Sequence, residues 1–158
     1  MNQIRSRFRG GFVSLLLMAV GMLVFAQNAM ALDPINTTFF GNVAIDGYDP
    51  VAYFLERKPV EGSGDYEYEW MGATWRFASE KNLEIFKSKP EYYAPQYGGY
   101  CAYAVSQNTT ADIDPVAWRI VRNKLYLNVT LHIQKIWEED IRGYITKADA
   151  NWPGLLAE

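Results

Sequence analysis

The 158-residue chain carries 18 acidic and 15 basic residues, which gives a formal net charge of −3 at pH 7. Its length suffices for one domain with a modest core, and its acidic balance argues against nucleic acid as a partner. The chain has one cysteine and therefore cannot form an internal disulfide, so its stability must come from packing.

The N-terminus has the three parts of a cleavable export signal. Three arginines within the first nine residues precede an apolar run over residues 11–26, and Ala29-Met30-Ala31 supplies the small-x-small pattern of signal peptidase. The apolar run is shorter than the roughly 20 residues that a bilayer span requires. We therefore predict a Sec-type signal peptide over residues 1–31, cleavage after Ala31, and a periplasmic or secreted domain over residues 32–158.

Cleavage would change the charge of the protein. It would remove three of the fifteen basic residues and none of the eighteen acidic ones, so the mature chain would carry a net charge of −6. No basic run remains, which excludes nucleic acid and an anionic membrane surface as partners. The expected partner is instead an unknown small molecule, a metal or a periplasmic protein, with no membrane attachment after cleavage.

The first half of the mature chain predicts a turn, a short strand and a hairpin. Asp49 is restricted to extended backbone because it precedes Pro50, and the apolar residues 51–54 are typical of a short buried strand. Residues 66–70 alternate tyrosine or tryptophan with glutamate, and residues 74–77 return as the second arm of a hairpin. We expect the Asp49 carboxylate to accept backbone amide bonds, so that Asp49→Ala costs about 1–2 kcal/mol.

A helix and a second hairpin follow. Ser79 is a suitable N-cap for a helix with apolar residues at helical spacing, and Pro90 ends that helix. Residues 118–121 and 124–127 predict a second hairpin around Arg122-Asn123, in which the asparagine tolerates positive φ.

From Thr130 the pattern becomes helical, and Gly143 indicates a break between two shorter helices, which should end before Asn151. His132 falls on the polar side of this segment and is predicted to be solvated, which disfavours a metal or catalytic role. Together the patterns predict a small single α+β domain with two antiparallel hairpins packed against three or four helices. The apolar stripe of the last segment consists of Ile133, Ile136, Trp137, Ile141, Tyr144, Ile145 and Ala148.

The stretch around the single cysteine is the strongest candidate for chemistry. Gly98 and Gly99 indicate positive φ or close approach by another group. The apolar residues behind them predict a buried helix, and if it begins near Gly99 or Tyr100, Cys101 lies in its first turn. Unpaired amides and the helix dipole would there favour a thiolate. A buried packing cysteine fits the same pattern equally well.

Five motifs occur in order along the chain: Tyr48-Asp49-Pro50-Val51-Ala52-Tyr53-Phe54, Trp75-Arg76-Phe77-Ala78-Ser79, Pro90-Glu91-Tyr92, Tyr97-Gly98-Gly99-Tyr100-Cys101-Ala102 and Ala148-Asp149-Ala150-Asn151-Trp152-Pro153. Together they resemble a YHS domain, most closely the exported proteins known as YHS domain-containing (seleno)proteins. The resemblance covers nearly all of residues 40–154 and implies a small α+β module, often supposed to bind heavy metals, with no settled activity for this branch.

The chain departs from the metal-handling members of that family. Their cysteines correspond to Ala52, Ala78 and Asn82 here. Soft metals need thiolate or imidazole ligands, about four for a structural zinc. We therefore expect no required cofactor, and at most transient Cu or another soft metal at Cys101. The resemblance also implies that selenium-containing relatives carry selenocysteine at the position of Cys101, which favours redox use.

Two functions remain open. The first is thiol redox chemistry or transient soft-metal handling with Cys101 as the candidate catalytic thiol, although no Cys-His-Asn or resolving-cysteine pattern indicates an enzyme class. The second is a non-catalytic binding module for a small ligand or protein partner, in which aromatic side chains line a pocket. A buried thiol that faces no cavity would favour the second. The candidate binding residues are Tyr48, Asp49, Tyr97, Gly98, Gly99, Tyr100 and Tyr103.

Overall fold

The computed structural model describes residues 32–157, so the predicted signal peptide lies outside the described residues. Two antiparallel two-stranded sheets and six α-helices within this range form a small α+β fold, as predicted. Among the helices of residues 32–157, none combines the length and the apolar character needed to cross a membrane.

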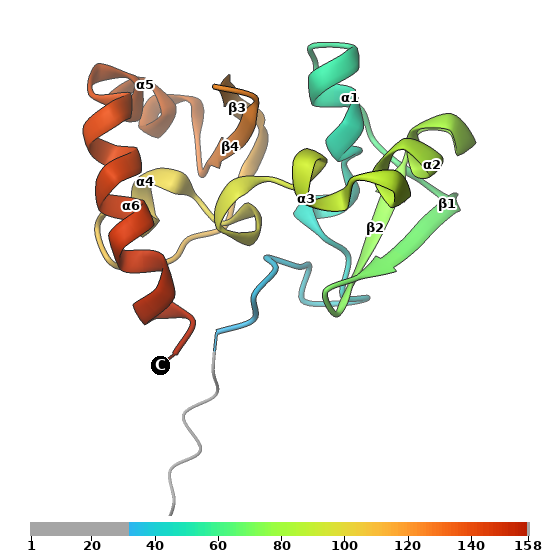
Figure 1. Ribbon diagram of the computed structural model, residues 1–158, viewed down its shortest axis with the longest axis horizontal. Coiled ribbons are helices and arrows are strands. Elements are labelled where there is room, and N and C mark those ends of the chain that lie inside the picture. The colour runs from blue at the N-terminus through green and yellow to red at the C-terminus, as the bar shows by residue number, and fades with distance from the viewer. Residues whose placement is uncertain (1–31, 158) are drawn as a thin grey trace, which may run out of the picture.

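The elements of the two halves of the chain gather in two groups (Figure 1). The first group, on the right of the figure, holds the first hairpin with three helices around it. A short 3-10 helix, η1 (Ile45–Gly47), precedes this group in the chain. The elements of the first group are α1 (Pro50–Leu55), β1 (Ser63–Trp70), β2 (Ala73–Phe77), α2 (Glu80–Ser88) and α3 (Pro90–Tyr93).

The second group holds the other hairpin and the C-terminal helices, on the left of Figure 1. A 3-10 helix, η2 (Gln96–Gly99), connects the two groups, and the long last helix runs alongside the short helix that follows Cys101. The elements are α4 (Ala102–Ser106), β3 (Asp114–Val121), β4 (Lys124–Asn128), α5 (Leu131–Glu139) and α6 (Ile141–Leu155).

The prediction of a buried strand over residues 51–54 is wrong, because this segment belongs to α1. Asp49 is the N-cap of the helix and keeps extended backbone (φ −75°, ψ 111°), while Pro50 occupies the first helical position. A proline there loses no hydrogen bond, and its fixed φ suits the helix. A short run of buried apolar residues is compatible with either element, so the cap and the proline decide the outcome.

The C-terminal segment forms two helices as predicted, but the break and the end differ from the prediction. The break falls at Asp140, whose carboxylate accepts a hydrogen bond from the amide of Gly143 at 2.9 Å and caps α6. The prediction that the helix ends before Asn151 is wrong, because α6 continues through Pro153 to Leu155. Near a helix end, a proline removes only one intrahelical hydrogen bond. The sequence predicted three or four helices. Residues 32–157 contain six α-helices, because α1 and α3 were not predicted as helices.

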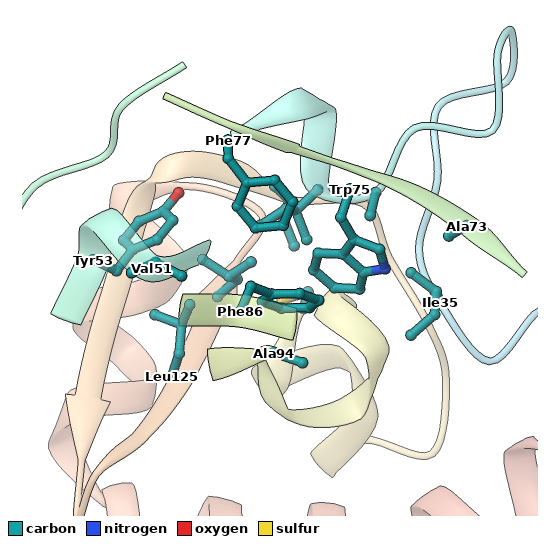
Figure 2. Packing of buried hydrophobic residues seen from close by; sticks show 14 of the residues in the cluster. Ile35, Val51, Tyr53, Ala73, Trp75, Phe77, Phe86, Ala94 and Leu125 are labelled. Carbon is teal, nitrogen blue, oxygen red and sulfur yellow. The ribbon is translucent and has the colours of Figure 1, made fainter. Parts of the chain in front are cut away.

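The larger core cluster joins the two groups. Phe86 of α2 packs against Trp75 and Phe77 of β2, with ring centroids 5.2 and 5.1 Å apart. Figure 2 shows Tyr53 of α1 and Leu125 of β4 to the left of Phe86, with Trp75 to its right. Burial of each such side chain stabilises the fold by about 1.5–3 kcal/mol. A second cluster lies between α4, β4 and the last two helices and consists of Tyr97, Ala102, Val105, Tyr126, Trp137, Ala148 and Leu155.

Candidate functional site

The paired glycines before Cys101 allow the N-terminal segment to approach closely, as the sequence predicted. Gly98 and Gly99 have φ values of +60° and +87°. A Cβ atom on Gly98 would lie 1.9 Å from the carbonyl oxygen of Pro34, and one on Gly99 would lie 2.5 Å from Cγ2 of Ile45. The amide of Asn36 donates to the carbonyl of Gly98 at 2.8 Å. These glycines therefore bind a neighbouring segment of the chain itself.

Cys101 is fully buried, with 0% of its surface exposed. It is the N-cap of α4 and so lies one residue before the first helical turn. Its Sγ donates to Oδ1 of Asn128 at 3.7 Å, and the same oxygen accepts a hydrogen bond from the amide of Tyr103 at 3.3 Å. The helix amide that was expected to favour a thiolate is thus bound to Asn128. Cys101 lines none of four surface cavities on the described part of the molecule.

Tyr97 and Tyr100 lie together beside the C-terminal helix. The Tyr97 hydroxyl donates to Oδ1 of Asp149 at 2.8 Å, and burial followed by this hydrogen bond raises the pKa of Tyr97. Its ring packs against Trp152 and Tyr126 at centroid distances of 5.9 and 6.0 Å. The ring of Tyr100 also packs against Trp152, with centroids 6.0 Å apart. These tyrosines act mainly as packing residues between η2 and α6.

Two further candidate tyrosines have separate surroundings. The Tyr48 hydroxyl donates to Glu61 at 3.5 Å, and desolvation followed by this carboxylate raises the pKa of Tyr48. Tyr103 packs its ring against Tyr144 of α6, with centroids 5.2 Å apart. The structure therefore does not gather the candidate tyrosines into one shell around the thiol.

Asp49 is the most densely bonded carboxylate of the described residues and is fully buried. Its Oδ1 accepts hydrogen bonds from the amides of Val51 at 2.8 Å and Ala52 at 3.2 Å. Its Oδ2 accepts from the amide of Ala78 at 2.9 Å and from Nδ2 of Asn82 at 2.7 Å. The predicted turn bonds are confirmed, and the carboxylate additionally connects α1 to the end of β2 and to α2.

The three positions at which the YHS resemblance implies cysteine in metal-handling relatives meet around this carboxylate. Ala52, Ala78 and Asn82 each donate a hydrogen bond to Asp49 and offer no thiolate or imidazole. Four donors already occupy the oxygens of Asp49. Across residues 32–157 no group of three or more His, Cys, Asp or Glu side chains is arranged to hold a metal ion. The donor set does not fit a soft metal.

We expect Asp49→Ala to destabilise the protein by about 3 kcal/mol or more, above the range expected from the sequence, because it leaves several buried donors without an acceptor. Urea denaturation monitored by tryptophan fluorescence would measure the loss. The matched control is Asp140→Ala, which removes an exposed aspartate cap with one amide bond and should cost about 1 kcal/mol. Equal losses for both variants would show that the Asp49 network contributes nothing beyond an ordinary cap.

A cavity of about 630 Å³ lies between the β3–β4 hairpin and α6, and we call it the C-terminal cavity. Sequence reasoning missed its residues because they come from two segments that meet only after folding. The only local sign of this site in the sequence was the pair of basic residues, Arg122 and Lys124, at the predicted hairpin turn. The cavity is lined by Val121, Arg122, Lys124, Tyr126, Ile141, Arg142, Ile145, Thr146 and Asp149.

Tyr126 lines this cavity and is 3% exposed. Its ring packs against Trp137, with centroids 5.4 Å apart, and against Tyr97. No hydrogen bond joins its hydroxyl to another residue between 32 and 157, but this oxygen is not among the buried polar atoms without a partner, which are Nδ2 of Asn128, Oε1 of Gln134 and Nε1 of Trp137. The hydroxyl therefore opens into the cavity. Burial and the charge of Asp149 raise the pKa of Tyr126 to about 12, although the nearby Arg122 opposes this shift.

Comparison with known families matches residues 51–97 to the YHS domain. No curated protein and no solved structure matches the chain. The matched segment runs from α1 to Tyr97 and includes the Asp49-binding positions Ala52, Ala78 and Asn82, whereas Cys101 and the C-terminal cavity lie beyond it. The resemblance inferred from the sequence motifs is confirmed for this segment, since residues 51–97 match the YHS domain.

Proposed function

We propose that the protein is an exported, non-catalytic module that binds a small organic ligand in the C-terminal cavity. The observation that carries this proposal is the cavity itself, into which the hydroxyl of Tyr126 opens. No hydrogen bond joins this hydroxyl to another described residue, and it is not one of the buried polar atoms that lack a partner. Water can therefore bond to it in the free protein, and a polar atom of a bound ligand can replace that water.

The size and lining of the cavity support this proposal. Its volume of about 630 Å³ falls within the range of roughly 300–1,000 Å³ that is typical of small-molecule sites. Val121, Ile141 and Ile145 supply apolar surface, and the other lining side chains carry polar or charged groups. Apolar surface that holds a ligand and polar groups that fix its orientation are both features of small-molecule sites.

Thiol redox chemistry at Cys101, with or without a transient soft metal, is the competing function. It requires access to Sγ, whereas this atom is buried and bonded to Asn128. The YHS domain suggests a metal-related role, but the donors around Asp49 do not fit a soft metal. Ligand binding in the C-terminal cavity requires no rearrangement of the Cys101 thiol or of the donors around Asp49, and for that reason we favour it.

Binding of a neutral apolar dye to the purified protein tests the proposal. N-phenyl-1-naphthylamine should show increased fluorescence with the wild type, and Thr146→Trp, which places a large side chain in the cavity, should weaken binding by about tenfold or more. The matched control is Ala150→Trp, because Ala150 is exposed on the same helix and lines none of the four cavities described above. Equal dye binding by both variants would refute the proposal, and so would failure of the wild type to bind both this dye and its sulfonated analogue.

A further inference from the structure

We infer that the ligand of the C-terminal cavity carries an anionic group, such as a carboxylate, sulfonate or phosphate; this inference rests on the proposed function. Three basic side chains line the cavity: Arg122, Lys124 and Arg142. Asp149 is the single acidic residue in the same lining. The side chains around the cavity therefore carry an excess of positive charge.

The three basic side chains are not neutralised by the surrounding protein. None of them forms an ion pair with a carboxylate of residues 32–157, whereas Arg119 of β3 pairs with Glu138 at 3.5 Å. Asp149 also accepts the hydrogen bond from the Tyr97 hydroxyl at 2.8 Å. The cations of the cavity thus remain available to a ligand.

The hydroxyl of Tyr126 and the guanidinium of Arg122 both come from the β3–β4 hairpin, and both residues line the cavity. The charge of Arg122 lowers the pKa of Tyr126 against the larger effect of burial. Both are hydrogen-bond donors, and an anionic oxygen is the acceptor that satisfies both of them. A neutral ligand would satisfy the hydroxyl but leave the guanidinium without a counter-charge.

The cations approach the cavity from two elements. Arg122 and Lys124 flank Asn123 in the β3–β4 turn, where Arg122 and Asn123 both have positive φ. Arg142 belongs to the first turn of α6. The predicted mature chain has a net charge of −6, with twelve basic residues. A cavity lined by three of those twelve would attract small anions to one place on an otherwise acidic protein.

A pair of probes with the same aromatic framework tests this inference. 1-Anilinonaphthalene-8-sulfonate carries a sulfonate, and N-phenyl-1-naphthylamine lacks it. The wild type should bind the sulfonate at least about tenfold more tightly, because it adds charge-assisted hydrogen bonds. The double variant Arg122→Gln/Arg142→Gln should lose this advantage and retain its affinity for the neutral probe.

The matched control is Lys135→Gln/Lys147→Gln, which removes the same charge from exposed positions outside the cavity lining. It should bind both probes as the wild type does, and an equal loss of sulfonate binding would overturn the inference in favour of a general charge effect. Similar wild-type affinities for both probes would also overturn it and leave the proposed function intact. Absence of binding for both probes would refute the proposed function itself. The wild-type comparison needs no variant to fold.

Discussion

Cys101 is expected to react with iodoacetamide at least about a thousandfold more slowly in the folded protein than in denaturing urea. Its side chain is fully buried and lines none of the four cavities described above. Alkylation therefore requires the core around α4 to open, and an opening free energy of about 4 kcal/mol already slows the reaction about a thousandfold. Mass spectrometry at successive times would measure the rate.

The single cysteine makes this measurement simple to interpret. Every alkylated thiol is Cys101, and a Cys101→Ser protein serves as the blank. A folded-state rate within about tenfold of the denatured rate would contradict the prediction. The thiol would then be accessible despite its hydrogen bond to Asn128, and redox chemistry would become the better proposal.

Gly98→Ala is expected to destabilise the protein by more than about 3 kcal/mol. The new Cβ would lie 1.9 Å from the backbone oxygen of Pro34, and the residue would also have to keep a φ of +60°. A backbone oxygen cannot move aside as the end of a flexible side chain can, so the N-terminal segment must separate from η2. The expected result is a large decrease of the midpoint of urea denaturation.

Gly72→Ala is the control that separates backbone strain from the clash. Gly72 has a φ of +77°, and a Cβ there meets no atom within 4 Å. This variant therefore loses only the conformational preference of glycine, about 1 kcal/mol. If Gly98→Ala and Gly72→Ala lose the same stability, close approach by the N-terminal segment does not explain the glycine, and the contact with Pro34 is weak.

Much of the local structure could be predicted from the sequence. The alternation over residues 66–70 and the return at residues 74–77 predicted the first hairpin, which the structure contains as β1 and β2. Ser79 accepts the amide of Asn82 at 3.2 Å and begins α2 as predicted. The solvation of His132 is also confirmed, since this side chain is exposed. These features depend on neighbours within a few residues in the sequence, so local rules suffice.

The misassigned elements show where local rules fail. The apolar residues of α1 satisfy the requirements of a buried strand or of a short helix, and the structure selects the helix through the Asp49 cap and Pro50. Pro153 is accommodated inside α6 because packing of the rest of that helix outweighs the loss of one hydrogen bond. For α1 the periodicity alone missed two local signals, the cap and the proline, whereas for α6 tertiary contacts add a free energy that the periodicity of the sequence does not contain.

The sequence by itself determined the type of fold, the YHS resemblance, the hydrogen-bonding role of Asp49 and the need for glycine at position 98. The tertiary structure alone decided the candidate site. Asn128, which is 27 positions away along the chain, shares its Oδ1 between Cys101 and the first turn of α4. Arg122 and Arg142 line one cavity only because α6 packs beside the β3–β4 hairpin. Burial and convergence of charge depend on residues distant in sequence, and for this reason neither could be read from the linear pattern.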